Sequence, residues 1–234
     1  SALGHAFFTL SLGMGTLITY GSYIKRDNNL INTVISVTVA DTLIAILAGI
    51  AIFPAVFAFG IEPSEGPGLI FITLPNVFHQ MPGGYIFSIL FFVLLTVAAI
   101  TSSISILEVV VAYFMEEFKM VRKSSTVLAT ILISILGVLC SLSMGVLADY
   151  KLFGLNIFDL MDWISANMLF PIGGLFIALF TGWYFGRKKV QEEVANGGNL
   201  SGAMLTIFIF LVKFVAPIAI AIVILNKVGL LTFS

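Results

Sequence analysis

The strongest constraint on the fold is a series of six apolar runs, each long enough to cross a lipid bilayer. They lie at about 3–24, 29–59, 84–115, 124–148, 157–186 and 203–226. About 20 apolar residues cross the hydrocarbon core as a helix, and only helices or closed barrels satisfy the backbone there. Because the runs are long and show no alternation of apolar and polar residues, we expect an all-α, polytopic transmembrane helix bundle.

Composition and motifs support a membrane protein and argue against a soluble domain, a nucleic-acid-binding protein and an enzyme. The chain is 59% hydrophobic and 10% charged, whereas a soluble domain is nearer a quarter charged. A net charge of −1 gives no electrostatic case for binding nucleic acid. No catalytic triad, zinc-binding HExxH motif or phosphate-binding loop occurs in the sequence, so we expect that the protein is not an enzyme.

Basic residues between the runs predict the orientation in the membrane. Eight fall on one side and two, Lys151 and Lys227, on the other, which makes the eight-residue side cytoplasmic. Both ends of the chain then lie on the outer side, and we expect helices that precede this sequence, with a processed six-helix protein as the alternative. The eight are Lys25, Arg26, Lys119, Arg122, Lys123, Arg187, Lys188 and Lys189.

The outer segment 60–83 is too long and too rich in proline and glycine for a simple loop. Pro63, Pro67, Pro75 and Pro82 divide it into two short apolar stretches. Long connections of this kind are usually lids or packed caps, so we expect a hairpin of short helices over the outer face.

A stretch of glycines and hydroxyls lies in the middle of the first run, at residues 9–15. Gly13 and Gly15 weaken a helix here by about 1 kcal/mol each relative to alanine. One interpretation is close packing against another helix through small residues. The other is an unwound stretch, which in transporters exposes carbonyls and helix ends at mid-membrane. The stretch alone leaves both open.

The third run contains four hydroxyls within five residues, at Thr101, Ser102, Ser103 and Ser105. Sodium is a small, hard cation that favours oxygen ligands, by the logic that holds for calcium and magnesium. The Thr101 and Ser102 hydroxyls with the Ala98 carbonyl therefore form a candidate part of a sodium cage.

Acidic side chains inside the runs are the remaining candidates. Asp41 and Glu108 lie deep in apolar sequence, where a charge costs at least about 2.5 kcal/mol. For Asp41 we favour ion coordination or local charge balance. Glu108 could serve an ion pathway or pair with another helix, and Lys213 in the last run is a candidate structural partner. Asp159 and Asp162 open the fifth run, as first-turn acids or as a gate.

Taken together, the motifs resemble the neurotransmitter:sodium symporter family, specifically its bacterial amino-acid transporters of the leucine-transporter type. The resemblance covers essentially the whole chain and rests on the order and spacing of several stretches. These are GHAFFTLSLGMGTLITYGSY, DTLIAILAGIAIFPAVFAFG, GPGLIFITLPNVFHQMPGG, AAITSSISILEVVVAYFMEE and DLMDW.

The resemblance implies a domain division. Residues 1–186 would form the second five-helix inverted repeat, beginning at the family's sixth helix, and residues 187–234 a cytoplasmic loop and an additional sixth span. The family's first repeat, helices one to five, would be the missing partner of this chain.

The resemblance also implies ligands for sodium. Thr9 and Asp41 match the first sodium site, and Ala98, Thr101 and Ser102 match the second. Asp41 stands where the family has an asparagine, so this chain departs from the pattern by a carboxylate. A fixed negative charge there would replace the chloride that animal members need, and we expect chloride independence.

Substrate and gate residues follow from the same resemblance. Phe8 matches an aromatic lid, Asp162 an outer gating acid, and Glu116 with Tyr23 an inner gate. Met14 stands where an aromatic residue is common. The implied substrate-binding residues are Phe8, Thr9, Ser11, Gly13, Met14, Ser102 and Ile106.

The function implied is sodium-coupled symport of an amino acid by alternating access, with this chain as part of the transporter. The alternative is an ion channel or a non-transporting structural membrane subunit. We expect sodium ions and no organic cofactor, and as partners an amino-acid substrate, sodium, the lipid bilayer and the first repeat. The expected location is a bacterial inner membrane.

Overall fold

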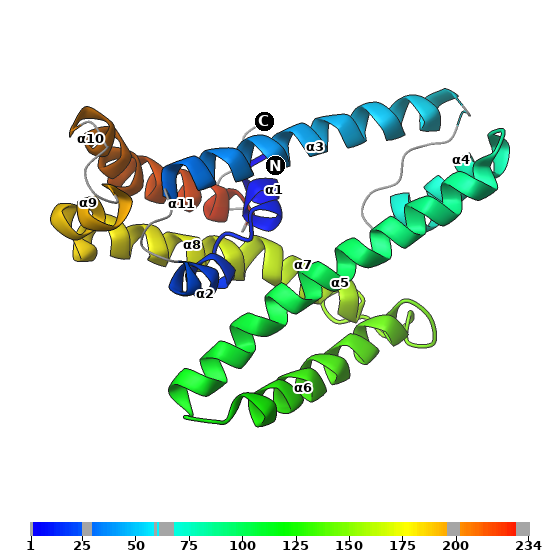
Figure 1. The fold of residues 1–234 in the computed structure, drawn as a ribbon. Helices are drawn as coiled ribbons and strands as arrows, with labels where there is room; N and C mark the ends of the chain where they lie inside the picture. The colour runs from blue at the N-terminus through cyan, green and yellow to red at the C-terminus, as the bar shows by residue number, and fades with distance from the viewer. Residues whose placement is uncertain (1, 25–29, 59, 61–67, 196–201, 228–234) are drawn as a thin grey trace. The chain divides into compact units, whose positions relative to one another are not determined.

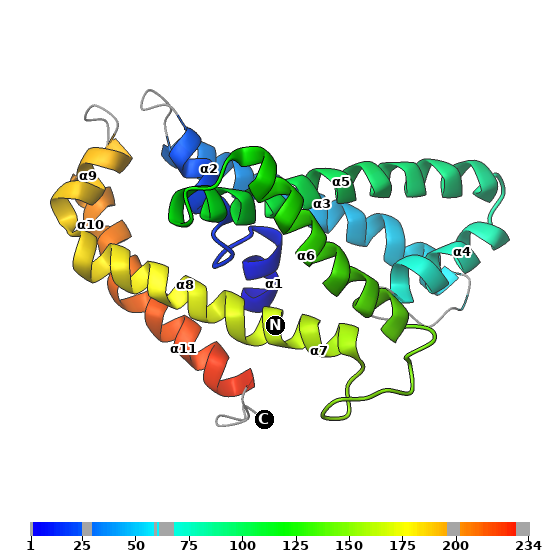
Figure 2. The same cartoon turned by 90° about the horizontal axis from the view of Figure 1, so that it is seen from below.

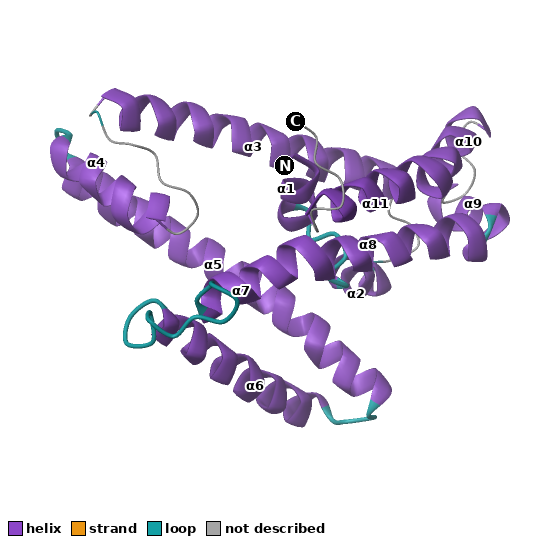
Figure 3. Cartoon of the chain, turned by 180° about the vertical axis from the view of Figure 1, so that it is seen from behind, coloured by secondary structure: helices purple, strands orange, loops and turns teal. Residues whose placement is uncertain are grey.

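A computed structural model describes residues 2–24, 30–58, 60, 68–195 and 202–227. Within these ranges the regular structure is helical, and the β-type pairing is one isolated bridge between Leu152 and Leu155. Figures 1 and 3 show helices joined by turns and short loops. The chain divides into two compact units, residues 1–33 with 106–234 and residues 34–105.

The helices follow the apolar runs closely. Their bounds in chain order are α1 Ala2–Thr9, α2 Thr16–Tyr23, α3 Leu30–Ala58, η1 Leu69–Thr73, α4 Leu74–Gln80, α5 Gly84–Glu117, α6 Arg122–Ser143, α7 Ile157–Ile164, η2 Ser165–Leu169, α8 Phe170–Leu179, η3 Phe180–Phe185, α9 Arg187–Ala195, α10 Gly202–Phe210, η4 Leu211–Val215 and α11 Ala216–Lys227. The segments labelled η are π-helical turns.

Five helices are long and apolar enough to cross a membrane, by length and composition, within the described residues. They are Leu30–Ala58, Gly84–Glu117, Arg122–Ser143, Ile157–Phe185 and Leu205–Lys227. Their apolar side chains are largely exposed. Exposed apolar side chains suit a helix that faces lipid, whereas a water-soluble protein buries them in its core.

The first apolar run is broken in the middle. α1 ends at Thr9 and α2 begins at Thr16, and between them Ser11, Gly13 and Gly15 have φ of 52°, 78° and 82°. A positive φ is strained for residues with a Cβ and readily adopted by glycine. The glycine-rich stretch is therefore unwound, as the transporter interpretation requires.

The same glycines also pack closely, so the two interpretations of this stretch hold together. A methyl group at Gly13 would overlap the carbonyl oxygen of Phe170, and one at Gly173 would overlap the carbonyl of Gly13. Phe7, which is 4% exposed, lies where a methyl group at Gly174 would have to be. The absence of side chains on both partners lets the break lie directly on α8.

Proline explains three of the four π-helical segments found in the described residues. The segments η1, η2 and η4 end two residues before Pro75, Pro171 and Pro217, respectively. Proline has no N–H, so the carbonyl four residues earlier loses its α-helical donor. Widening the preceding turn to a π-type pattern accommodates that loss. The fourth segment, η3, ends at Gly186, where φ is 84°.

Hydroxyl and amide side chains join α6 to α7. Ser143 is fully buried; its hydroxyl donates to the Cys140 carbonyl at 2.7 Å and accepts from the Phe158 N–H at 3.0 Å. Asn156 caps α7 by accepting from the Asp159 N–H at 2.8 Å. α6 ends at Ser143, earlier than the range to about 148 expected from apolar character.

In the second unit, a short helix lies against α5. The rings of Phe71 and Phe92 stack at 6.3 Å between centroids, and those of Phe78 and Phe91 lie 5.6 Å apart. This helix, η1 with α4, accounts for the second apolar stretch of segment 60–83. Residues 61–67, where the other half of the predicted hairpin falls, lie outside the described residues.

α8 and α11 run side by side in the first unit, with η3 beside η4 (Figures 1 and 2). The contact is close, because a methyl group at Gly182 would lie 2.8 Å from the Cα of Lys213. The last span is thus held to the fifth along its length.

The packing at Gly13 predicts a large effect of one added methyl group. Gly13→Ala combines a left-handed φ, which costs about 1 kcal/mol or more, with overlap against the α8 backbone. We expect a clear fall in the melting temperature of the purified protein.

Gly137→Ala is the matched control, because no atom lies within 4 Å of its added methyl group and alanine favours a helix. We expect the control to be neutral or stabilising. Equal melting temperatures for both variants would contradict the described contact.

Candidate functional site

The unwound stretch forms the centre of the candidate site in the first unit. Ser11, Gly13 and Met14 lie in it, and Phe8, in the last turn of α1, is 60% exposed. On its α5 side, a methyl group at Gly15 would contact the Val109 side chain at 3.3 Å. Ile106 lies one helical turn before Val109. The structure therefore brings five of the predicted substrate-binding residues to one region of the unit. They are Phe8, Ser11, Gly13, Met14 and Ile106.

Backbone polar groups around the break are available to a ligand. α2 begins at Thr16 after Gly15, and no side chain caps its N-terminus. The first N–H groups of a helix lack intrahelical partners and favour anions. Thr16 is only 5% exposed. Its hydroxyl oxygen is buried and has no hydrogen-bond partner in the described part of the chain. Sequence reasoning missed Thr16; its position directly after the break was the available signal.

In the second unit, two predicted sodium ligands lie together on α5. The Thr101 hydroxyl donates to the Ala98 carbonyl at 2.8 Å. Both oxygens keep further lone pairs that can accept or coordinate. Ser102 follows on the same exposed turn. These three residues offer a small, hard cation two hydroxyls and a carbonyl.

The first predicted sodium site draws on both units. Thr9 ends α1 in the first unit, and Asp41 lies in α3 in the second. Both take part in polar interactions within their surroundings. Their meeting around one ion stays a prediction.

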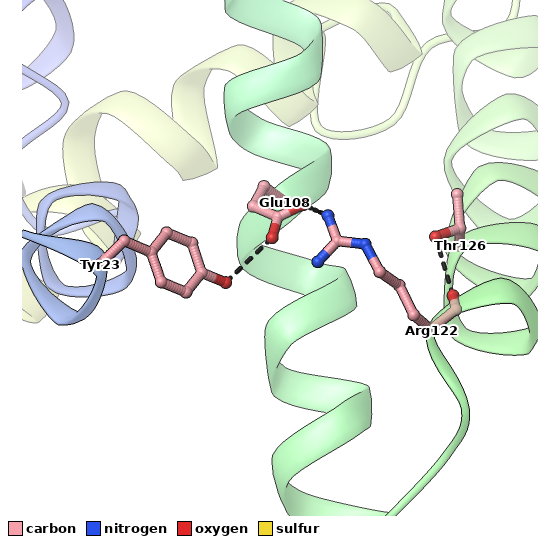
Figure 4. A network of polar contacts seen from close by, with 4 residues as sticks. All are labelled: Tyr23, Glu108, Arg122 and Thr126. Carbon is pink, nitrogen blue, oxygen red and sulfur yellow. Dashed lines mark hydrogen bonds and ion pairs between the residues drawn. The ribbon is translucent and has the colours of Figure 1, made fainter.

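Glu108 lies in a hydrogen-bonded group that is complete within this chain (Figure 4). The Tyr23 hydroxyl donates to Glu108 Oε1 at 2.9 Å, and Arg122 donates to Glu108 Oε2 at 2.6 Å. The Glu108 side chain is 17% exposed and that of Arg122 is 59% exposed. α2, α5 and α6 each supply one member, so the group ties the end of the broken helix to two long spans.

This group answers a question that the sequence left open. A half-buried carboxylate in an apolar run needs a partner, and Glu108 finds two, of which one is cationic. Lys213, the other candidate, has its ammonium group over the Trp183 ring instead. Arg122 was not predicted as a partner because it lies fourteen residues away, beyond the turn between α5 and α6.

The remaining predicted gate residues lie apart from this group. Glu116 is two turns further along α5, and within the described residues the Tyr23 hydroxyl pairs with Glu108. Asp162 lies exposed in α7. Asp159 has a structural role, because its carboxylate accepts from the Asn156 side-chain amide at 2.7 Å and its N–H is capped by the same residue.

These features define a class: a polytopic helical membrane protein with a discontinuous helix and clustered hydroxyl groups within one span. The comparison with known proteins identifies the family. Residues 1–232 match the family described as SNF, Sodium:neurotransmitter symporter family. The chain belongs to this family, as the sequence motifs predicted, and its relatives are transporters rather than enzymes.

Individual relatives agree. An uncharacterized sodium-dependent transporter of Bacillus subtilis strain 168, YhdH, is 41% identical over 232 residues, which cover 99% of this chain and 51% of the relative. An uncharacterized sodium-dependent transporter of Haemophilus influenzae is 38% identical over 226 residues, covering 96% of this chain and 49% of the relative.

A solved structure shows the fold. MhsT in complex with L-phenylalanine matches with a TM-score of 0.88 and 47% identity, over 97% of this chain and 51% of that chain. The chain thus spans about half the length of the relatives it matches. Its fold is that of an integral membrane protein of the leucine-transporter type.

The Tyr23–Glu108 hydrogen bond predicts non-additive effects on stability. Tyr23→Phe should lower the melting temperature when Glu108 is present and change it little in a Glu108→Ala background, because the acceptor is then gone. The measurement is a double-mutant cycle read by thermal unfolding.

Tyr113→Phe provides the control. Tyr113 also lies exposed at a helix surface, and its hydroxyl makes no hydrogen bond in the described part of the chain. Its effect should be the same with and without Glu108. Additive behaviour of Tyr23→Phe and Glu108→Ala would count against the hydrogen bond.

Proposed function

We propose that this chain is part of a transporter that carries an amino acid across the membrane together with sodium, by alternating access. The observation that carries the proposal is the unwound stretch between α1 and α2, which the family model covers. Discontinuous helices at mid-membrane present carbonyls to cations and helix N-termini to anionic groups. An amino acid has one group of each kind.

The backbone around the break suits both ends of such a substrate. The uncapped start of α2 at Thr16 offers N–H donors for a carboxylate, and carbonyls near Phe8 and Thr9 would receive the ammonium group. Ser11, Gly13, Met14 and Ile106 would line the side-chain pocket, with Ser102 supplied by the other unit. Phe8 would cover the substrate. L-phenylalanine, which is bound in the MhsT structure, is the first compound to test.

Coupling to sodium would come from shared ligands. In this proposal Thr9, Asp41 and the substrate carboxylate surround one ion, so that ion and substrate each need the other. Ala98, Thr101 and Ser102 hold a second ion with the help of the first repeat. The hydroxyl–carbonyl pair of Thr101 and Ala98 supports this second site.

Gates on both sides would control access. The group of Tyr23, Glu108 and Arg122 joins the end of α2 to α5 and α6, and an inward opening that moves α2 must loosen it. Tyr23 and Glu116 would act at this inner gate, and Asp162 at the outer one. The excess of basic residues supports a cytoplasmic inner side. In this proposal the membrane is a bacterial inner membrane, and both ends of this chain lie outside.

A channel or a non-transporting structural subunit is the alternative function. A channel needs a polar path through the whole span, whereas four of the hydroxyls of α5 cluster at residues 101–105 and the rest of the helix is largely apolar. The transporter is therefore the better-supported function.

The sodium site predicts a selective effect of Thr101. In the intact transporter, Thr101→Ala should raise the sodium concentration for half-maximal amino-acid uptake by at least about tenfold, because one oxygen ligand is lost. Ser103→Ala is the matched control, since its hydroxyl also donates to a carbonyl of its own helix, at 2.7 Å from Ala99. An equal shift in both variants, or uptake without sodium dependence, would refute the site.

The carboxylate of Asp41 predicts chloride-independent transport. Replacing it by a neutral residue, Asp41→Ser, should make uptake depend on chloride, because the fixed negative charge is lost. Asp149→Ser, at an exposed outer turn, should leave uptake independent of chloride. Full activity of Asp41→Ser in chloride-free buffer would show that Asp41 has another role.

A further inference from the structure

Lys213 is a cation inside the last membrane span, and no part of the proposed transport cycle uses it. It lies in η4, within the candidate span Leu205–Lys227. A lysine in a span needs a counter-charge, a polar cavity or a route to the interface. Within the described residues the one salt bridge is that of Arg122 with Glu108, so Lys213 has no carboxylate partner there.

Aromatic rings hold the Lys213 ammonium group. Nζ lies 4.3 Å from the centroid of the Trp183 ring and 5.6 Å from that of Phe214. The two rings meet edge to face at 5.8 Å. Cation–π contacts favour a charged ammonium group, but they do not neutralise it.

The backbone at Lys213 is fixed by the same tryptophan. Pro217 has no N–H, so the Lys213 carbonyl lacks its α-helical donor. The Trp183 indole N–H donates to that carbonyl at 3.2 Å. Gly182 permits the close approach of the two helices. Trp183 therefore sets both the position of the lysine backbone and the direction of its side chain.

Further cations lie toward the same end of the span. Side chains of a helix lean toward its N-terminus, which for Lys213 is the Gly202 end of α10. There Arg187 donates to the Thr206 hydroxyl at 2.9 Å, and Lys188 and Lys189 follow in α9. Lys189 Nζ lies 5.7 Å from the Phe185 ring centroid. α9 also has two acids, Glu192 and Glu193, neither of which forms an ion pair in the described structure.

Exposed aromatic side chains lie on the same segments, η3 and α10, as the groups that carry or contact these cations. Trp183 is 60% exposed, Tyr184 81% and Phe210 56%. A cation inside a span, with further cations toward the end of the span and exposed aromatic rings nearby, matches an amphiphile with an anionic head and apolar chains better than a free anion. Basic pockets between spans are known binding places for anionic lipid head groups.

We propose that an anionic phospholipid binds between η3–α9 and α10–η4. Lys213 and Arg187 contact its phosphate, and its acyl chains lie along Trp183, Tyr184 and Phe210. Lys213 thereby obtains its counter-charge from the membrane. The proposal does not depend on transport or on the substrate.

Native mass spectrometry of the intact transporter, released from nanodiscs of mixed phosphatidylcholine and phosphatidylglycerol, tests this site. Lys213→Met should reduce retained phosphatidylglycerol at least about fivefold and leave phosphatidylcholine unchanged. Lys213→Arg should retain the lipid, which separates charge from packing. Lys227→Met, which removes the same charge at the other end of the span, should behave as the wild type.

Three results would overturn the proposal. One is unchanged phosphatidylglycerol on Lys213→Met. Another is equal loss from Lys227→Met, which would indicate a general charge effect. The third is displacement of the lipid by inorganic phosphate, which would indicate a site for free anions. Arg187→Gln tests the same site independently, in case the Lys213 variant misfolds. It should weaken lipid retention while Lys213 and its aromatic contacts remain.

Discussion

The contact between the break in the first helix and α8 is the interaction on which the rest of the first unit depends. Gly13 packs on the backbone of Phe170, Gly173 on that of Gly13, and Phe7 on Gly174. Because these glycines have no side chains, the unwound backbone can lie directly against a continuous span. Within a membrane, backbone that is not helical is tolerated where it is buried in protein in this way. The positive φ values at Ser11, Gly13 and Gly15 then persist because their surroundings fix them.

Proline gives the spans a second level of local structure. Each proline in η1–α4, η2–α8 and η4–α11 removes one donor, and a π-type turn precedes it. At Lys213 the freed carbonyl accepts from Trp183, so a local backbone defect becomes a contact between two spans. Lipid gives no hydrophobic driving force for one span to pack on another. Polar contacts such as this one, and those of Tyr23, Glu108 and Arg122, therefore help to fix which spans are neighbours.

Local properties of this chain could be predicted from the sequence, and long-range pairings could not. Apolar run length located the spans, and the glycine–hydroxyl pattern marked the break, because both depend on neighbouring residues. The partners of Glu108 and Lys213 depend on packing: Arg122 lies beyond a turn, and Trp183 is thirty residues from Lys213. The end of α6 at Ser143 was missed because the sequence stays apolar beyond it, whereas the contact of Ser143 with the Phe158 N–H depends on packing. The sodium and substrate ligands remain predictions, because the proposed sites combine residues that are far apart in the sequence.

If the break itself receives the substrate, a bound ligand should protect a cysteine placed in the break from chemical modification. In the intact transporter with Cys140→Ser and Ser11→Cys, sodium with a transported amino acid should slow modification by a thiol reagent. Leu17→Cys, exposed on α2, should react at the same rate with and without ligand. Modification of Ser11→Cys that neither sodium nor any amino acid slows would show that the substrate does not bind at the break.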